Sequence, residues 1–189
     1  RKRMDGASQE HADFILAEMR PNGRLPRTWK EGVAKINGYL EDYAMVIDGL
    51  IATYSATFEL RFMRSASELA AEMIDLFWDD AVQGFYEKVR VKPTTLTIRF
   101  DNAAPAGTSL AIGVLLRLAL LTGNGGFERR ATTCLRTLVP YVDQAATAFG
   151  HLLSALDFHL SRPQELAIVW QGERDGVDAL VAVAREGFR

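Results

Sequence analysis

The sequence predicts a mainly α-helical protein in which two-helix hairpins repeat along the chain. The first observation is an internal match, because the segment beginning at Gly49 aligns without a gap with the segment beginning at Val114. The second is that each copy joins a helix that is apolar on nearly every face to a helix that is apolar on one side. The third is a glycine-rich turn, residues 123–126, between the two helices of the second copy. Together they predict an inner and an outer layer of helices.

The inner helices are expected over residues 38–58 and 105–122, and a third begins near Gly150. Apolar residues cover almost the whole circumference of the first two, which is typical of a helix buried on all sides. They are Leu40, Tyr43, Ala44, Ile47, Leu50, Ile51 and Tyr54 in one copy, and Leu110, Ile112, Val114, Leu115, Leu116, Leu118 and Leu121 in the other.

The outer helices carry one apolar stripe at helical spacing. In the first copy the stripe is Phe62, Ala66, Leu69, Ala70, Met73 and Phe77, and in the second it is Phe127, Ala131, Cys134, Leu135 and Leu138. Cys134 is therefore expected to be a packing residue, and Pro140 should end or kink its helix. A partial copy, ASQEHADFILAEM from Ala7, resembles the first outer helix, so an outer helix is expected near the start of the chain.

Short extended segments precede the inner helices and are expected to lie at one rim of the array. They cover residues 23–30, 84–91 and 95–100, the last with alternating apolar and polar residues. After the last inner helix, residues 165–170 read as a strand and residues 177–185 as a short helix.

Composition and charge exclude several classes of function. The chain of 189 residues is 48% hydrophobic and 24% charged, and its net charge of −2 gives no broad basic surface for nucleic acid or an anionic membrane. The longest apolar run, residues 110–121, contains Arg117 and is too short to span a bilayer. One cysteine rules out an internal disulfide and favours a reducing, cytoplasmic location. Since the chain starts at Arg1 without an apolar signal segment, we expect a piece of a longer polypeptide.

Candidate functional residues fall where the inner helices begin, because loops at one rim of a helical ring form a concave surface. Asp42 could act as a general base or bind a sugar hydroxyl, and Tyr43 could stack on a sugar ring. Asp101 is a second candidate catalytic carboxylate and Asn102 a candidate substrate-binding residue. Both precede the second inner helix, whose Gly107 allows close backbone approach. The alternative for each aspartate is structural: Asp42 would interact favourably with the dipole of its helix, and Asp101 would cap the helix that follows.

Other sites are expected to be absent or weaker. Trp29 and Tyr86 could line a carbohydrate platform, although aromatic residues in such positions are more often part of the core. His11, His151 and His159 do not have the spacing of metal ligands, so no metal site is expected. The sequence has no phosphate-binding glycine loop and no nucleophile elbow, and no cofactor is expected.

Four stretches resemble one known family. They read GYLEDYAMVIDGLIATYSATFELRF, LFWDDAVQGFYE, VKPTTLTIRFDNAAPAGTSLAIGVLLRLALLTGN and PQELAIVW. They are similar to stretches of the thioredoxin-domain-containing proteins related to the spermatogenesis-associated protein, which carry a six-hairpin glycosidase-like domain. The resemblance extends from about residue 12 to residue 170. The toroid of this family is also similar to that of the N-acylglucosamine 2-epimerase and cellobiose epimerase group.

The resemblance implies a partial (α/α)₆ toroid with β-hairpins at one rim. Residues 1–162 would form the C-terminal half of the toroid, and residues 163–189 a strand-helix appendage. A thioredoxin-like domain and the first half of the toroid would belong to a full-length relative. Asp42, Tyr43 and Asp101 match the family's residues, and so does Ser109, which makes it a further candidate for substrate binding. Ala106 and Thr108 replace a serine and an asparagine of the family pattern.

Two functions follow as expectations. The first is carbohydrate binding or processing of an epimerase-like or hydrolase-like kind, in which the isolated chain is inactive because other catalytic groups lie in the missing half. The second is a non-catalytic helical scaffold that binds a protein partner or presents clients to a fused thioredoxin-like domain. Either way, the cut edge of a half ring exposes apolar helix faces, so we expect self-association or packing with the missing half.

Overall fold

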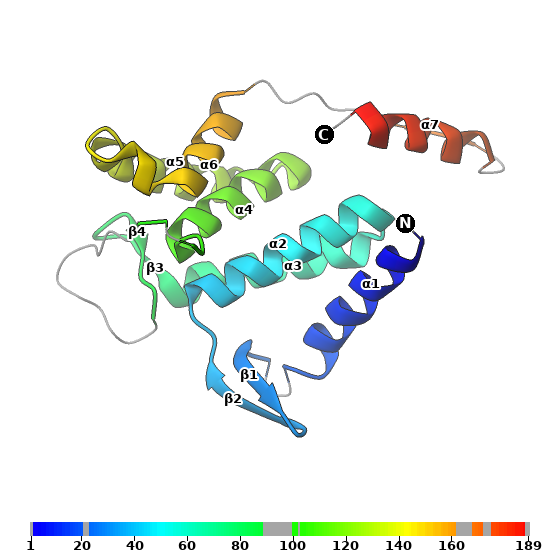
Figure 1. Ribbon diagram of the computed structural model, residues 1–189, viewed down its shortest axis with the longest axis horizontal. Helices are drawn as coiled ribbons and strands as arrows, with labels where there is room; N and C mark the ends of the chain where they lie inside the picture. Colours follow the sequence, from blue (N-terminus) through cyan, green and yellow to red (C-terminus); the bar gives the residue numbers. More distant parts are fainter. Residues whose placement is uncertain are drawn as a thin grey trace.

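A computed structural model describes residues 2–20, 23–88, 100–101, 103–161, 168–171 and 175–187 of the chain. This part is mainly helical and contains two small antiparallel sheets (Figure 1). The elements in chain order are α1 (Lys2–Ala17), β1 (Pro26–Lys30), β2 (Val33–Asn37), α2 (Leu40–Thr57), α3 (Leu60–Phe77), β3 (Trp78–Asp79), β4 (Gly84–Phe85), α4 (Gly107–Thr122), α5 (Gly125–Val142), the 3₁₀ helix η1 (Ala146–Ala148), α6 (Gly150–Leu160) and α7 (Asp175–Gly187).

The repeated hairpin is confirmed by two pairs of helices, α2–α3 and α4–α5, each joined by a turn of two residues. The first residue of both turns is in the left-handed region, Phe58 with φ of 58° and Gly123 with φ of 70°. This conformation ends a helix sharply and costs glycine little. Asn124 then caps α5, because its Oδ1 accepts a hydrogen bond of 2.9 Å from the backbone N–H of Gly126.

The inner helices α2, α4 and α6 lie side by side and start at the same rim (Figure 1). A Cβ added to Gly107, at the start of α4, would lie 3.0 Å from the backbone nitrogen of Glu41, near the start of α2. Asp101 accepts hydrogen bonds from the residue directly before α4 and from the first turn of α6. Since the N-termini of neighbours meet, the three inner helices run parallel to one another.

Burial differs between the inner helices. Helix α4 packs between α2, α5 and α6, and its residues are buried on nearly all sides, as the sequence predicts. For α2 the prediction of burial on all sides was wrong, because Met45 is 46% exposed and both Gly49 and Ala52 are exposed. The reason is a missing neighbour: α2 has α4 on one side only, and α1 covers just part of the other. On α6 only Leu152 and Ala155 are buried.

The outer helices bury the predicted stripes. All six stripe residues of α3 are buried, and so are the five of α5: Phe62, Ala66, Leu69, Ala70, Met73 and Phe77, then Phe127, Ala131, Cys134, Leu135 and Leu138. Pro140 does not stop α5 at once, since the helix continues to Val142. The early outer helix expected from the partial copy is α1, which packs against α2.

Cys134 has no exposed surface, which confirms it as a packing residue. Burial raises the pKa of its thiol to about 12. Because the thiolate is the reactive form, we expect Cys134 to resist a thiol reagent in the native protein at neutral pH and to react fully after denaturation. Release of the chromophore from Ellman's reagent would measure both rates, and rapid labelling of the native protein would contradict the expectation.

The extended segments are only partly as predicted. Strand β1 confirms the segment 23–30, whereas its partner β2 was not predicted; Thr28 pairs with Lys35. Strand β4 takes up the start of segment 84–91 and pairs with β3. Segment 95–100 lies outside the described residues except for its last residue, and so does the first half of segment 165–170. Residues 168–170 form no strand, but α7 confirms the helix predicted over 177–185.

Within the described ranges, no helix is both long enough and apolar enough to cross a membrane.

Candidate functional site

Asp42 lies in the first turn of α2 and closes that turn. Its Oδ2 accepts a hydrogen bond of 2.8 Å from the backbone N–H of Tyr39, just before the helix. The same oxygen is 3.1 Å from Nη1 of Arg27, which also pairs with Glu41 at 2.8 Å. Asp42 therefore has a structural role at the start of α2, and a catalytic role for it stays a prediction.

Tyr43 is completely buried beneath that rim. Its hydroxyl donates a hydrogen bond of 2.5 Å to Oε1 of Glu72 and accepts one of 3.2 Å from the backbone N–H of Leu25. Its ring meets that of Phe77 edge-on, with the centroids 5.5 Å apart. Burial, and then the hydrogen bond to Glu72, raise the pKa of the phenol to about 12. Neither face of the ring is open to a sugar in this conformation.

Asp101 joins two inner helices. Its Oδ1 accepts a hydrogen bond of 2.8 Å from the backbone N–H of Ala106, directly before α4. Its Oδ2 accepts two more, of 2.9 Å from His151 and 3.0 Å from Leu152, both in the first turn of α6. Three backbone donors thus occupy both oxygens of this carboxylate, which caps one helix and positions another.

The remaining predicted residues do not gather around the two aspartates. Ser109 is buried in the first turn of α4, and Tyr86 is buried beyond β4. Trp29 lies on β1 and packs edge-on against Phe14 of α1, with the ring centroids 5.7 Å apart. Asn102 lies outside the described residues. Binding roles for these side chains stay predictions.

Glu87 is a rim residue that the sequence did not single out. Its backbone oxygen accepts a hydrogen bond of 3.1 Å from the N–H of Leu40, the first residue of α2. Its side-chain Oε2 is 2.9 Å from the position that a Cβ would take at Gly107. Gly107 therefore does allow the close approach that was expected, and the groups that approach are the start of α2 and the Glu87 carboxylate.

A second polar group spans the inner helices, and we call Asp48, Arg117 and His151 the inner-helix polar cluster. Nη2 of Arg117 on α4 is 2.5 Å from Oδ1 of Asp48 on α2, and both side chains are more than a third exposed. The Arg117 Nε donates a 3.4 Å hydrogen bond to the carbonyl of Gly113. Nε2 of His151 on α6 is 3.8 Å from where a Cβ of Gly113 would lie. Each of the three inner helices thus contributes one ionisable side chain, and the three lie near the face of α4 that carries Gly113 and Arg117.

One member of this cluster stands out in the sequence, because Arg117 interrupts the longest apolar run of the chain. No pattern within the sequence places Asp48 beside it, since 69 residues separate the two. As for metals, the described residues include no group of three or more histidine, cysteine, aspartate or glutamate side chains arranged to hold an ion.

No family model matches this chain. Three curated relatives are named spermatogenesis-associated protein 20. The protein of Rattus norvegicus is 28% identical over 172 residues, that of Homo sapiens 27% and that of Mus musculus 26%, each covering 85% of this chain. An uncharacterized protein of Caenorhabditis elegans is 27% identical over 68% of the chain. The chain spans about a fifth of the length of these relatives, 22% for the mammalian proteins and 19% for the nematode one.

Proposed function

We propose that this chain is part of an α/α toroid and binds a carbohydrate along its inner helices through the inner-helix polar cluster. The observation that carries the proposal is the placement of Asp48, Arg117 and His151 on three parallel helices that are otherwise largely apolar. A carboxylate, a guanidinium and an imidazole together offer both acceptors and donors, which suits the hydroxyl groups of a sugar.

In this proposal the two predicted catalytic aspartates act by positioning. Asp101 holds the first turn of α6, and with it the backbone of His151, against the start of α4. Asp42 fixes the start of α2, less than two turns before Asp48. Catalysis by either carboxylate would require it to leave its backbone donors. We therefore expect the chain to bind a sugar without turning it over, and the reaction of any longer protein is a separate question.

Binding is tested by titrating the chain with N-acetylglucosamine and with cellobiose in a calorimeter. We expect saturable heat with at least one sugar, and Arg117→Ala should weaken that binding about tenfold or more, which corresponds to about 1.4 kcal/mol. Arg136→Ala is the matched control, because Arg136 is exposed on the outer helix α5. The proposal fails if neither sugar binds or if both variants bind as the unmodified chain does.

A non-catalytic scaffold is the second candidate, and one observation favours it. Both aspartates that were expected to be catalytic accept hydrogen bonds from backbone N–H groups at helix starts. On this reading the helices present a surface to a protein partner or to a fused thioredoxin-like domain. Normal binding of a protein partner by the Arg117→Ala variant, with no response to sugars, would support it.

A further inference from the structure

The ion pair between Arg117 and Asp48 uses only part of what each side chain offers. Arg117 contacts Oδ1 of Asp48 through Nη2, at 2.5 Å, and its Nε donates a 3.4 Å hydrogen bond to the carbonyl of Gly113. Within the described residues, no contact involves Nη1 of Arg117 or Oδ2 of Asp48. Because the two groups touch at one atom each, an unused donor and an unused acceptor lie next to each other.

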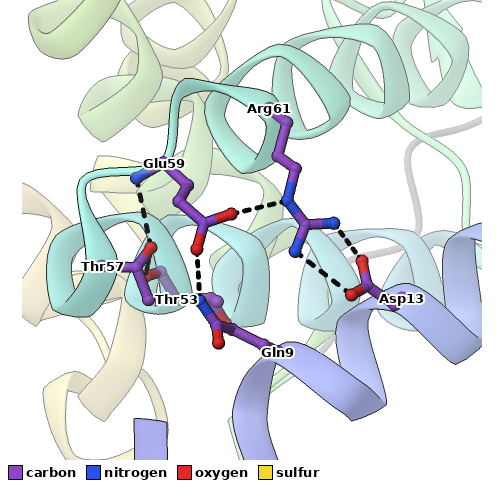
Figure 2. Close-up of polar contacts among 6 residues, drawn as sticks. All are labelled: Gln9, Asp13, Thr53, Thr57, Glu59 and Arg61. Atoms are coloured by element: carbon purple, nitrogen blue, oxygen red, sulfur yellow. Dashed lines mark hydrogen bonds and ion pairs between the residues drawn. The ribbon is translucent and has the colours of Figure 1, made fainter. Parts of the chain in front are cut away.

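Arg61 forms the complete arrangement in the same chain, as Figure 2 shows. Its two terminal nitrogens pair with the two carboxylate oxygens of Asp13, and its Nε donates to Glu59 at 2.7 Å. A guanidinium and a carboxylate frequently pair in this two-pronged way, because their planar forks match. The single contact between Arg117 and Asp48 departs from that geometry and leaves the second prong of each group to a ligand.

This open pair lies on a partly exposed stripe of α4. Gly113, Arg117 and Leu120 are spaced along one face of the helix and are partly exposed, whereas residues 114–116 are buried. Leu121, one turn after Arg117, is 48% exposed. The polar pair therefore borders an apolar surface on the same helix.

The opposite charges of the pair decide which class of ligand can use both groups. A ligand carboxylate or phosphate would be attracted by Arg117 and repelled by Asp48, and an amine would meet the reverse. Two neighbouring hydroxyl groups satisfy both side chains, since one accepts from the guanidinium while the other donates to the carboxylate. A pyranose ring combines such hydroxyls with an apolar C–H face that suits Leu121.

We propose that the inner-helix polar cluster selects neutral pyranosides through two adjacent ring hydroxyl groups. One hydroxyl accepts from Nη1 of Arg117, and the other donates to Oδ2 of Asp48. His151, which approaches α4 at Gly113, contacts a further hydroxyl. This inference rests on the proposed function, because it names the class of ligand for the same cluster.

Three probes test the role of the adjacent hydroxyls: methyl β-D-glucopyranoside, its 3-deoxy derivative and its 6-deoxy derivative. Removing the 3-hydroxyl destroys both adjacent pairs of ring hydroxyls, whereas removing the 6-hydroxyl leaves them intact. Each probe is titrated into the ¹⁵N-labelled whole chain and followed by NMR. We expect saturable shifts of the amide signals of Gly113 and His151. The 3-deoxy probe should bind about tenfold or more weakly than the parent glycoside, and the 6-deoxy probe within about twofold of it.

Arg117→Lys tests the protein side of the same contact. Lysine keeps the positive charge but lacks the second terminal nitrogen, so binding of the parent glycoside should weaken about tenfold and the preference over the 3-deoxy probe should disappear. Since the ion pair is more than a third exposed, the melting temperature should stay close to that of the unmodified chain. Arg136→Lys, at an exposed site on α5, is the matched control and should leave binding unchanged.

Three results would overturn this inference and leave the proposed function standing. The parent glycoside and its 3-deoxy derivative could bind equally well, or N-acetylglucosamine or cellobiose could bind while the methyl glucoside does not. Equal binding by Arg117→Lys and the unmodified chain would show that the pair only joins α2 to α4. If none of the three sugars binds, the proposed function fails and this inference fails with it.

Discussion

Replacing Asp101 with alanine is expected to lower the free energy of unfolding by about 1–4 kcal/mol, because the loss of one helix cap costs about 0.5–2 kcal/mol and this carboxylate serves two helices. The substitution removes the acceptor of three backbone donors, from Ala106, His151 and Leu152. Urea denaturation followed by circular dichroism would measure the change. Loss of the hydrogen bonds to His151 and Leu152 should also make the first turn of α6 open more readily than α4. Faster hydrogen exchange at the start of α6 would detect this opening.

Two variants serve as controls for this prediction. Asp101→Asn keeps one acceptor oxygen and should cost less than the alanine variant. Asp157→Ala removes an exposed carboxylate from α6 and should stay within about 0.5 kcal/mol of the unmodified chain. If Asp101→Ala also stayed within that range, the carboxylate would not hold the helices together.

Tyr43→Ala should cost more, about 3–5 kcal/mol, because it deletes a fully buried aromatic ring at the base of the rim. Tyr43→Phe keeps the ring and should cost only about 1–2 kcal/mol, since the Leu25 N–H and the Glu72 carboxylate lose a hydrogen-bond partner. Urea denaturation of both variants would separate packing from hydrogen bonding. Equal losses would contradict the buried position of the ring.

The same phenol predicts a loss of stability in alkali. Its pKa is 10 in the unfolded reference and about 12 in the folded chain, so the folded state resists ionisation. The resulting stabilisation is fully present below pH 10 and is lost as the pH rises through about 12. Unfolding curves measured between pH 10 and about pH 12 should show the unmodified chain losing more stability than Tyr43→Phe. Equal losses in the two proteins would contradict a raised pKa of Tyr43.

The hairpins, their turn and the outer stripes were predictable because they depend on the order of residues within one helix. The stripe of α3 has a helical period, and the turn at Gly123 has the residue that its conformation needs. The exposed face of α2 was not predictable in this way. Its apolar residues also cover most of its circumference, although it contains Glu41, Asp42 and Asp48 where α4 contains only Arg117. The exposed face results from how many neighbours each helix has.

The rim was predictable and the roles of its residues were not. The sequence predicts Asp42 and Asp101 at the starts of inner helices, where both lie. It could not show that backbone donors from a distant helix would occupy Asp101, because 50 residues separate it from His151. The pairing of Asp48 with Arg117 likewise depends on how two helices are aligned side by side, which no local pattern encodes.

The parallel arrangement of α2, α4 and α6 has an electrostatic consequence. Each helix carries the equivalent of about half a positive charge at its N-terminus, and three such ends meet at one rim. The aligned dipoles repel one another, and the carboxylates of Glu41, Asp42, Glu87 and Asp101 lie where they offset that repulsion. An incoming anion would therefore meet carboxylates, two of them paired with Arg27, at N–H groups that are already occupied. The starts of these helices therefore do not offer a phosphorylated ligand the free N–H groups of a typical anion site.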